Sequence, residues 1–347
     1  VQVLTRHLHR NVTYQAIEFG RRARIPKPPE RVLSSHYGDC KDQALLLHQL
    51  LSAAGIPSFL ALIHSGTETQ PALPSLDQFN HMIVRVPGLK AGFVDPTVKH
   101  FPAGTLPPEL FKRQALVLDP EKPRLESMPD RALFPADQMT FTRDITVTTA
   151  GESLVQETFR LAGYTAAWMR FWLSEIQPAE RLAAVQRLLP NARWHLDDFA
   201  IDALEEDDAD LLLRLRYSIP PPASASPALA SVAVAALWEQ DYITPPFLKE
   251  RRNPFELLHP LKVESRINLQ LPREPAAAAL RAFSRSGKSE FCQWTTRAEP
   301  APGKDNTIAL SFQFEGASGM FPASRYPEWQ SAWSAAVEAW QSPIQLK

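Results

Sequence analysis

The clearest periodicity in the chain follows Cys40, where apolar residues recur at intervals of three and four. Such spacing predicts a helix with one apolar face turned toward a protein core. The positions on that face are Ala44, Leu47, Leu51 and Ala54. Gly55 comes next, where the end of a helix favours left-handed backbone geometry. The pattern therefore predicts a helix that begins at a cysteine and ends just before a glycine.

Two aspartates near the cysteine predict where this helix begins. Asp39 is a suitable N-cap, because its carboxylate can accept from free N–H groups of the first turn. Asp42, three residues later, completes a pattern like a capping box. A thiol at a helix N-terminus tends toward the thiolate, since the helix dipole favours negative charge there. The alternative is a buried structural cysteine, because free cysteines are among the most often buried residues.

Two short apolar runs further along predict a β-hairpin, at residues 79–86 and 92–97. A hairpin folded about Gly88 pairs His81 with Asp95, and directly opposed residues project from the same face of a sheet. A carboxylate on one ring nitrogen leaves the other nitrogen free to act as a base. Cysteine, histidine and aspartate are then the nucleophile, base and orienting acid of acyl transfer. The alternative is that His81 is a half-buried strand residue with no catalytic role.

Four motifs carry a resemblance to a known family: residues 36–42 (HYGDCKD), 53–57 (AAGIP), 79–81 (FNH) and 94–97 (VDPT). In this order they closely resemble the transglutaminase-like superfamily over roughly residues 1–118. The nearest relatives are bacterial envelope proteins that carry this core between two other domains. The resemblance implies a papain-like fold and a catalytic triad of Cys40, His81 and Asp95. Members include protein cross-linkers, peptidases and amidases, and some have lost catalysis, so the family indicates a mechanism more than a substrate.

Three further residues are candidates for an oxyanion or substrate pocket. Relatives place an aromatic residue near the active site ahead of the nucleophile, and Tyr14 fills that place on a strand predicted over residues 12–19. Its alternative role is packing across that strand pair. Tyr37 and Asn80, close before the nucleophile and the base, are the other two candidates. The backbone N–H of Cys40 is an expected oxyanion donor.

Composition excludes several classes of function. The chain has 347 residues with a formal net charge of −1, and no run of Arg or Lys suggests nucleic acid as a partner. Two cysteines do not make a disulfide framework. No apolar run reaches the ~18 residues of a membrane span. The acidic residues 205–210 lack the glycine-centred spacing of a calcium loop, so a solvated turn is favoured there and no metal or cofactor is expected.

The predicted organisation is α+β and has three parts. Residues 1–119 form a transglutaminase-like catalytic core, in which the nucleophile helix packs on an antiparallel sheet. Residues 120–137, rich in proline and mixed charges, are the expected linker. Residues 138–347 are expected to form a β-rich domain with helices, including a closing helix over residues 326–340. The resemblance also implies a periplasmic or envelope location, and an upstream β-rich domain in the full-length protein.

The sequence therefore predicts a cysteine enzyme that acts on amide or peptide bonds of a protein or peptide substrate through a thioester on Cys40. Hydrolysis and transfer to an amine both remain open, because the acceptor side of the groove decides between them. The alternative is a catalytically silent module of the same fold, which binds peptides or serves as an envelope scaffold.

Overall fold

The computed structural model describes residues 1–16, 19–101, 104–130, 137–189, 192–221, 231–232, 248–257, 260–274, 277–341 and 344–345. The chain divides into two compact units, Val1–Pro135 and Ala136–Lys347, and each is described by itself. Helices and several sheets occur in mixed order, which confirms the predicted α+β class.

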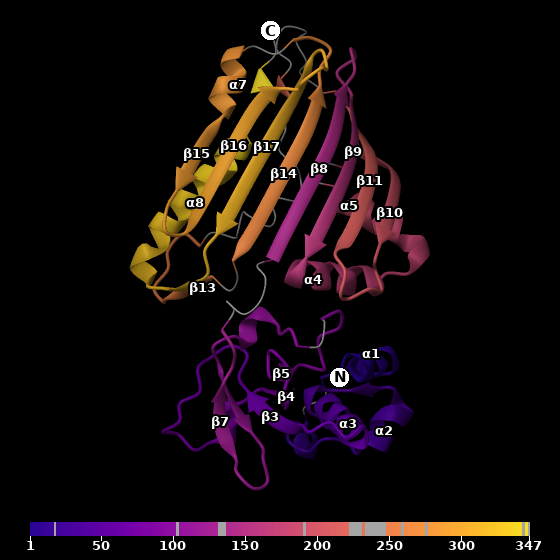
Figure 1. The fold of residues 1–347 in the computed structure, drawn as a ribbon, viewed down its shortest axis with the longest axis vertical. Coiled ribbons are helices and arrows are strands. Elements are labelled where there is room, and N and C mark those ends of the chain that lie inside the picture. Colours follow the sequence, from indigo (N-terminus) through magenta and orange to yellow (C-terminus); the bar gives the residue numbers. More distant parts are fainter. Residues whose placement is uncertain are drawn as a thin grey trace. The chain divides into compact units, whose positions relative to one another are not determined.

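The first unit is built on a five-stranded antiparallel sheet in the order β5-β4-β3-β6-β7 (Figure 1). Its strands are β3 (Phe59–Ile63), β4 (His81–Arg85), β5 (Phe93–Val94), β6 (Gln114–Val117) and β7 (Arg124–Ser127). The helices are α1 (Gln2–Asn11), α2 (Pro29–Ser35) and α3 (Cys40–Ala53), with short 3-10 turns η1 (Gly20–Ala23), η2 (Leu76–Gln78) and η3 (Pro108–Leu110). A parallel pair, β1 (Thr13–Tyr14) and β2 (Tyr37–Gly38), leads the chain into α3.

Helix α3 packs on this sheet through the face that the periodicity predicts. Ala44, Leu47 and Leu51 are fully buried and share a core cluster with Val84 of β4. Ala54, expected on the same face, is exposed instead. The reason is that the helix ends at Ala53, and Gly55 then turns the chain with a φ of +70°. The packing fixes the start of α3 against the sheet.

The segment predicted as a linker, residues 120–137, begins inside the first unit. Strand β7 lies within it and pairs with β6 along the edge of the sheet. Met128 continues the ladder by donating its N–H to the carbonyl of Arg113 at 2.8 Å. The prolines that favour a linker in the sequence flank this edge strand, where a missing N–H costs no ladder bond. Residues 131–136 lie outside the described part of the chain.

The second unit is dominated by an eight-stranded sheet in the order β10-β11-β9-β8-β14-β17-β16-β15. All neighbours are antiparallel except the central pair β8–β14. The strands are β8 (Asp137–Val147), β9 (Ser153–Ala162), β10 (His195–Asp202), β11 (Leu211–Ile219), β14 (Leu261–Gln270), β15 (Arg285–Lys288), β16 (Cys292–Pro300) and β17 (Thr307–Gly316). Short pairs join β12 (Ser231–Val232) to β19 (Ile344–Gln345) and β13 (Phe255–Leu257) to β18 (Gly319–Phe321).

Helices cover one face of this sheet, as Figure 1 shows for α5 (Arg181–Leu188) and α8 (Tyr326–Trp340) behind the strands. Within its described residues the unit also has helices α4 (Gly163–Ser174) and α7 (Ala277–Phe283), with 3-10 turns η5 (Pro178–Glu180) and η6 (Ala323–Arg325). Trp329, Trp333 and Trp340 of α8 lie in the core cluster, so the predicted aromatic face of the closing helix is a packing face.

A buried ion pair lies in this helix-facing core. Arg143 of β8 and Glu157 of β9 are opposed in the ladder, form an ion pair and are almost completely buried. The hydroxyl of Tyr217 donates to Glu157 at 2.9 Å. Arg143 occupies an inward position in the strand's alternation, where an apolar residue is the ordinary occupant. Its charge is tolerated because the carboxylate of Glu157 balances it and the hydroxyl of Ser265 accepts from it at 3.4 Å.

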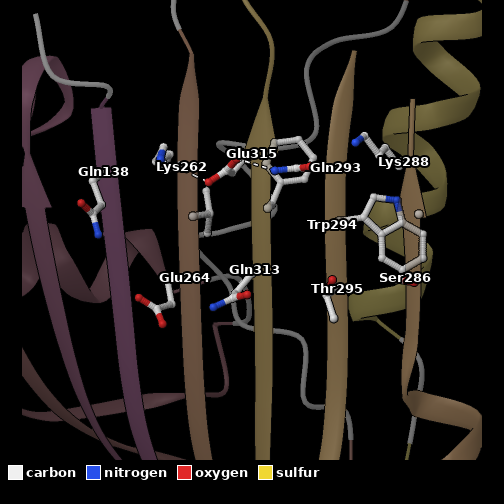
Figure 2. Close-up of a pocket in the computed structure, with 13 residues that line it drawn as sticks. Gln138, Lys262, Glu264, Ser286, Lys288, Gln293, Trp294, Thr295, Gln313 and Glu315 are labelled. Atoms are coloured by element: carbon white, nitrogen blue, oxygen red, sulfur yellow. Dashed lines mark hydrogen bonds and ion pairs between the residues drawn. The ribbon is translucent and has the colours of Figure 1, made fainter. Parts of the chain in front are cut away.

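The second unit also has a polar hollow of about 640 Å³ on its sheet (Figure 2). Neighbouring strands place Gln138, Lys262, Glu315, Gln293 and Lys288 directly opposite one another in one row. Glu315 accepts from Lys262 at 3.2 Å and from Gln293 at 2.6 Å. The residues that line the hollow include no thiol and no imidazole, so the groups that acyl transfer needs lie elsewhere.

Candidate active site

The three residues predicted as a triad lie at the ends of three adjacent elements in the first unit. Cys40 is the first residue of α3, His81 is the first residue of β4, and Asp95 directly follows β5. Strand β4 lies between β3 and β5 in the sheet. Because α3 packs on β4, residues separated by 40 and more positions in sequence meet at one edge of the unit.

His81 and Asp95 are in contact, although the hairpin register differs from the predicted one. The Nε2 atom of His81 lies 2.8 Å from Oδ2 of Asp95. The observed ladder pairs Val84 with Val94 and Arg85 with Phe93. The predicted pairing of His81 directly with Asp95 is therefore wrong by two residues. The reason is that the turn spans 87–91, closed by a bond from the Val86 N–H to the Gly92 carbonyl.

A shift of two residues keeps every side chain on the same face of a strand. Asp95 is therefore a diagonal neighbour of His81 rather than its direct partner, and diagonal neighbours are within reach of long side chains. This explains why the contact forms in spite of the different register.

The sulfur of Cys40 lies close enough to the ring of His81 to raise the pKa of that ring. Asp95 takes Nε2, so Nδ1 is the ring nitrogen left for the sulfur. Cys40 is 7% exposed, and the side chains of His81 and Asp95 are 16% and 3% exposed. A buried acid, a ring and a slightly accessible sulfur thus form a chain that ends at the surface. Such a chain can deprotonate the thiol and return the proton to a leaving group.

The charges around His81 favour its protonated form. Burial of the ring acts to lower its pKa, but the negative charge and hydrogen bond of Asp95, followed by those of Cys40, outweigh this and raise the pKa of His81 to about 10. The raised pKa keeps the ring protonated at neutral pH, so the ring can donate a proton.

Asp95 is held by the residues that follow it. Burial acts to raise the pKa of Asp95, but His81 and then Thr97 stabilise the carboxylate, and the net effect lowers the pKa. Oδ1 of Asp95 accepts from the N–H of Thr97 at 2.9 Å and from its hydroxyl at 2.7 Å. Thr97 is thus a supporting residue of the site; it is the last residue of the 94–97 motif, but no role was predicted for it. The signal was present, because an aspartate that accepts from the N–H two residues on forms a common local turn.

These shifts predict a pH-dependent contribution to stability. The pKa of His81 is 6.5 for an isolated group and about 10 in the fold, so its contribution is complete below pH 6.5 and is lost as the pH rises toward 10. The lowered pKa of Asp95 gives a contribution that is present above its ordinary value of 3.8 and is lost in acid. We expect the free energy of unfolding of the parent to exceed that of Asp95→Asn by the largest amount between pH 3.8 and pH 6.5.

Hydrogen exchange of α3 and β4 measures this difference, because all eight tryptophans lie beyond residue 136 and their fluorescence does not report on the first unit. Asp77→Asn is the matched control, since the side chain of Asp77 is 77% exposed. A stability difference for Asp95→Asn that does not vary with pH would contradict the assigned pKa shifts.

The first turn of α3 carries a network of charges that the sequence only partly predicts. Asp39 and Asp42 form the predicted capping box. Asp39 also forms a buried ion pair with Lys41, so its carboxylate has partners other than the neighbouring sulfur. Asp42 accepts from Arg22 and from the N–H of Lys27, both at 2.7 Å. The segment ahead of α2 is thereby fixed against the start of the nucleophile helix.

The three candidate pocket residues have different surroundings. Tyr14 lies on β1, paired with Gly38 of β2 two residues before Cys40, and is 42% exposed. Strand β1 covers only two of the residues 12–19 predicted as a strand, of which residues 17–18 lie outside the described ranges. The ring of Tyr37 lies 3.4 Å from Nζ of Lys27. Oδ1 of Asn80 accepts from the N–H of Ser65 at 3.0 Å. These contacts do not test a role in an oxyanion or substrate pocket, so Tyr14, Tyr37 and Asn80 all remain predictions.

Cys292 is buried in the second unit, and both cysteines are free thiols. Within the described ranges, no helix combines the length and apolar character of a membrane span. The part of the chain that the structure describes contains no group of three His, Cys, Asp or Glu side chains placed as metal ligands.

No family model matches this sequence, and no curated protein matches it. The structure is similar to the crystal structure of a "putative protease" from Parabacteroides distasonis, with a TM-score of 0.56 and 14% sequence identity. The similarity covers 99% of this chain and 50% of the other, so this chain spans about half the length of that protein. At this identity the match shows a shared fold and leaves the chemistry to the site itself.

Proposed function

We propose that this chain is a cysteine enzyme of transglutaminase-like, papain-like architecture that cleaves or transfers amide bonds of a peptide or protein substrate. The observation that carries the proposal is the ring of His81, which is hydrogen-bonded to Asp95 and lies close enough to Cys40 for the sulfur to raise its pKa. The four sequence motifs and the protease-like fold support it. By the same resemblance, we propose the bacterial envelope as its location.

In the proposed acylation step, the Cys40 thiolate attacks the carbonyl carbon of the substrate amide. The backbone N–H of Cys40, which has no intrahelical partner because it opens α3, donates to the developing oxyanion. His81 then gives its proton to the amide nitrogen as the C–N bond breaks and the amine departs. The products of this step are a Cys40 thioester, a neutral His81 and a free amine.

In the proposed second step, neutral His81 takes a proton from an incoming water or amine, which attacks the thioester carbonyl. The C–S bond breaks, the sulfur leaves as a thiolate, and the imidazolium is restored. Water yields a carboxylic acid and completes hydrolysis, whereas an amine yields a new amide. Asp95 keeps the ring oriented and stabilises its positive charge throughout.

Incubation of a peptide library with and without a primary amine, read by mass spectrometry, tests the proposal. Hydrolysis divides a peptide or converts a side-chain amide to an acid, and transfer adds the mass of the amine less ammonia. We expect one of these changes, dependent on Cys40. A library unchanged in both arms, with Cys40 unmodified, would overturn the proposal in favour of a silent peptide-binding or scaffold module.

A further inference from the structure

Helix α1 packs against the elements that carry the candidate triad. Leu8 of this helix and Val12, the residue that follows it, are almost completely buried. They share one core cluster with apolar residues of α3, β4 and β5. The nucleophile, the base and the acid lie at the ends of those three elements. The packing therefore fixes α1 relative to all three members of the triad.

His9 of the same helix reaches the segment that follows Asp95. Its Nε2 atom lies 3.0 Å from the carbonyl oxygen of Pro96, 87 positions further along the chain. Because a carbonyl oxygen only accepts, Nε2 carries the proton and the ring is the donor. Pro96 is buried, and a buried carbonyl group needs a hydrogen-bond partner. His9 therefore satisfies a backbone group that lies between Asp95 and Thr97.

This carbonyl belongs to the turn that holds the acid. Oδ1 of Asp95 accepts from the N–H and the hydroxyl of Thr97, whereas Oδ2 contacts the ring of His81. The turn closes around Pro96, so the directions of its carbonyl and of the Asp95 carboxylate depend on the same few backbone torsions. The ladder between β4 and β5 ends at Val94. Contacts outside the ladder, including the one from His9, therefore hold the turn.

The neighbouring histidine of α1 has different surroundings. His7 lies two positions before His9, and residues two positions apart on a helix do not face the same way. His7 is exposed, and its Nδ1 atom lies 3.4 Å from Nδ2 of Asn11 on the same helix. Of the two histidines, His9 is therefore the one that reaches the turn after Asp95.

We infer that His9 is a positioning residue of the proposed reaction: by holding the turn after Asp95, it keeps that carboxylate directed at the ring of His81. The inference rests on the proposed function and extends it by a residue that acts through Asp95. Without the N–H of His9, the buried carbonyl of Pro96 loses its donor, and the turn is expected to rotate toward another partner. The carboxylate then moves with the turn, and His81 loses part of the interaction that keeps its ring oriented and protonated.

The titration of the His81 ring measures this effect whether or not the chain turns over a substrate. The full chain is labelled with ¹⁵N-histidine, and the ring signals are followed by NMR from neutral to strongly alkaline pH. The signal of His81 is identified by its loss in His81→Ala. Its midpoint in the parent should lie at about 10. His9→Ala should shift this midpoint toward 6.5 by about one pH unit or more, a tenfold or larger change in proton affinity.

Three variants show whether the hydrogen bond is the cause. His9→Gln places an amide N–H close to the position of Nε2 and should restore the midpoint of the parent. His9→Asn carries the same amide on a chain one methylene shorter and should behave as His9→Ala does. His7→Ala is the matched control, because it makes the same replacement at an exposed histidine of the same helix. It should leave the midpoint unchanged.

Hydrogen exchange of α3 and β4 shows whether each variant is folded. If either His9→Ala or His9→Asn unfolds, the other provides the comparison. Unfolding of both would show that His9 supports the fold rather than the site, and would overturn the inference. An unshifted midpoint in a folded His9→Ala would overturn it as well, as would a midpoint in His9→Gln that is as low as in His9→Ala. An equal shift in His7→Ala would also contradict it.

Turnover of the peptides identified by mass spectrometry gives the catalytic measurement. His9→Ala should lower kcat by about 10- to 100-fold, because a small misplacement of an acid–base group slows the chemical step. KM should remain close to that of the parent, and His9→Gln should recover most of the rate. A change in KM alone would contradict a positioning role and leave the proposed function standing. If the parent turns over no peptide but the His81 midpoint shifts as expected, the proposed function fails while the role of His9 in holding Asp95 on His81 is supported.

Discussion

Replacement of Cys40 by alanine is expected to abolish amide turnover, with a loss of at least about 10³-fold in kcat/KM. The proposed thioester forms on the sulfur of Cys40, which lies close enough to the ring of His81 to raise the pKa of that ring. The substitution removes one small, almost buried group from the tip of α3, so the fold should persist. The measurement is turnover of the peptides identified by mass spectrometry, with hydrogen exchange as the check on folding.

Cys292→Ala is the matched control for this prediction. Cys292 is the other free, buried cysteine of the chain, and its sulfur lies 3.6 Å from the Ala332 carbonyl in the second unit. Burial raises the pKa of the Cys292 thiol, with a smaller opposing effect of Ser289, so it stays protonated at neutral pH. We expect Cys292→Ala to keep full turnover. Equal losses from both cysteine variants would show that the effect is not catalytic.

Replacement of His81 by alanine is expected to lower turnover by roughly 10²–10⁴-fold, the range that a positioned acid–base group contributes. It should also slow alkylation of Cys40 by iodoacetamide, because the group proposed to take the thiol proton is gone. The measurement is the alkylation rate of Cys40 as a function of pH, read by mass on the peptide that contains it.

His48→Ala is the matched control for His81. His48 is also a partly buried histidine and lies on α3, with Nδ1 2.9 Å from the hydroxyl of Ser58. Burial lowers its pKa, so it is neutral at pH 7 and supplies no charge to the sulfur. The control should leave alkylation and turnover unchanged. If the pH profile of Cys40 alkylation is the same in the parent and in His81→Ala, the proposal that His81 activates Cys40 is contradicted.

The local features of the site could be predicted from sequence because neighbouring residues determine them. The capping box depends on two aspartates three positions apart, and the start of α3 follows from it. The face of α3 that packs on the sheet follows from a spacing of three and four. The turn at Asp95 depends on Thr97 two residues away, so it was predictable in principle, although the motifs alone did not indicate it.

Features that join distant segments could not be predicted in this way. The predicted hairpin register is wrong by two residues, because the turn closes at Val86 and Gly92 rather than about Gly88. Strand β7 falls in the predicted linker, because prolines at a sheet edge resemble prolines in a spacer. The burial of Arg143 depends on Glu157, which lies opposite it on another strand.

By itself, the sequence determined the elements that carry Cys40, His81 and Asp95, their order, and the chemistry that such a set supports. The tertiary structure decided that the ring of His81 is hydrogen-bonded to Asp95 and that the sulfur of Cys40 acts on the same ring. The physical reason is the separation of the interacting residues along the sequence. Helix caps, turns and periodic patterns each depend on residues only a few positions apart. The meeting of side chains 40 or 50 positions apart depends on how a helix packs on a sheet and where loops cross.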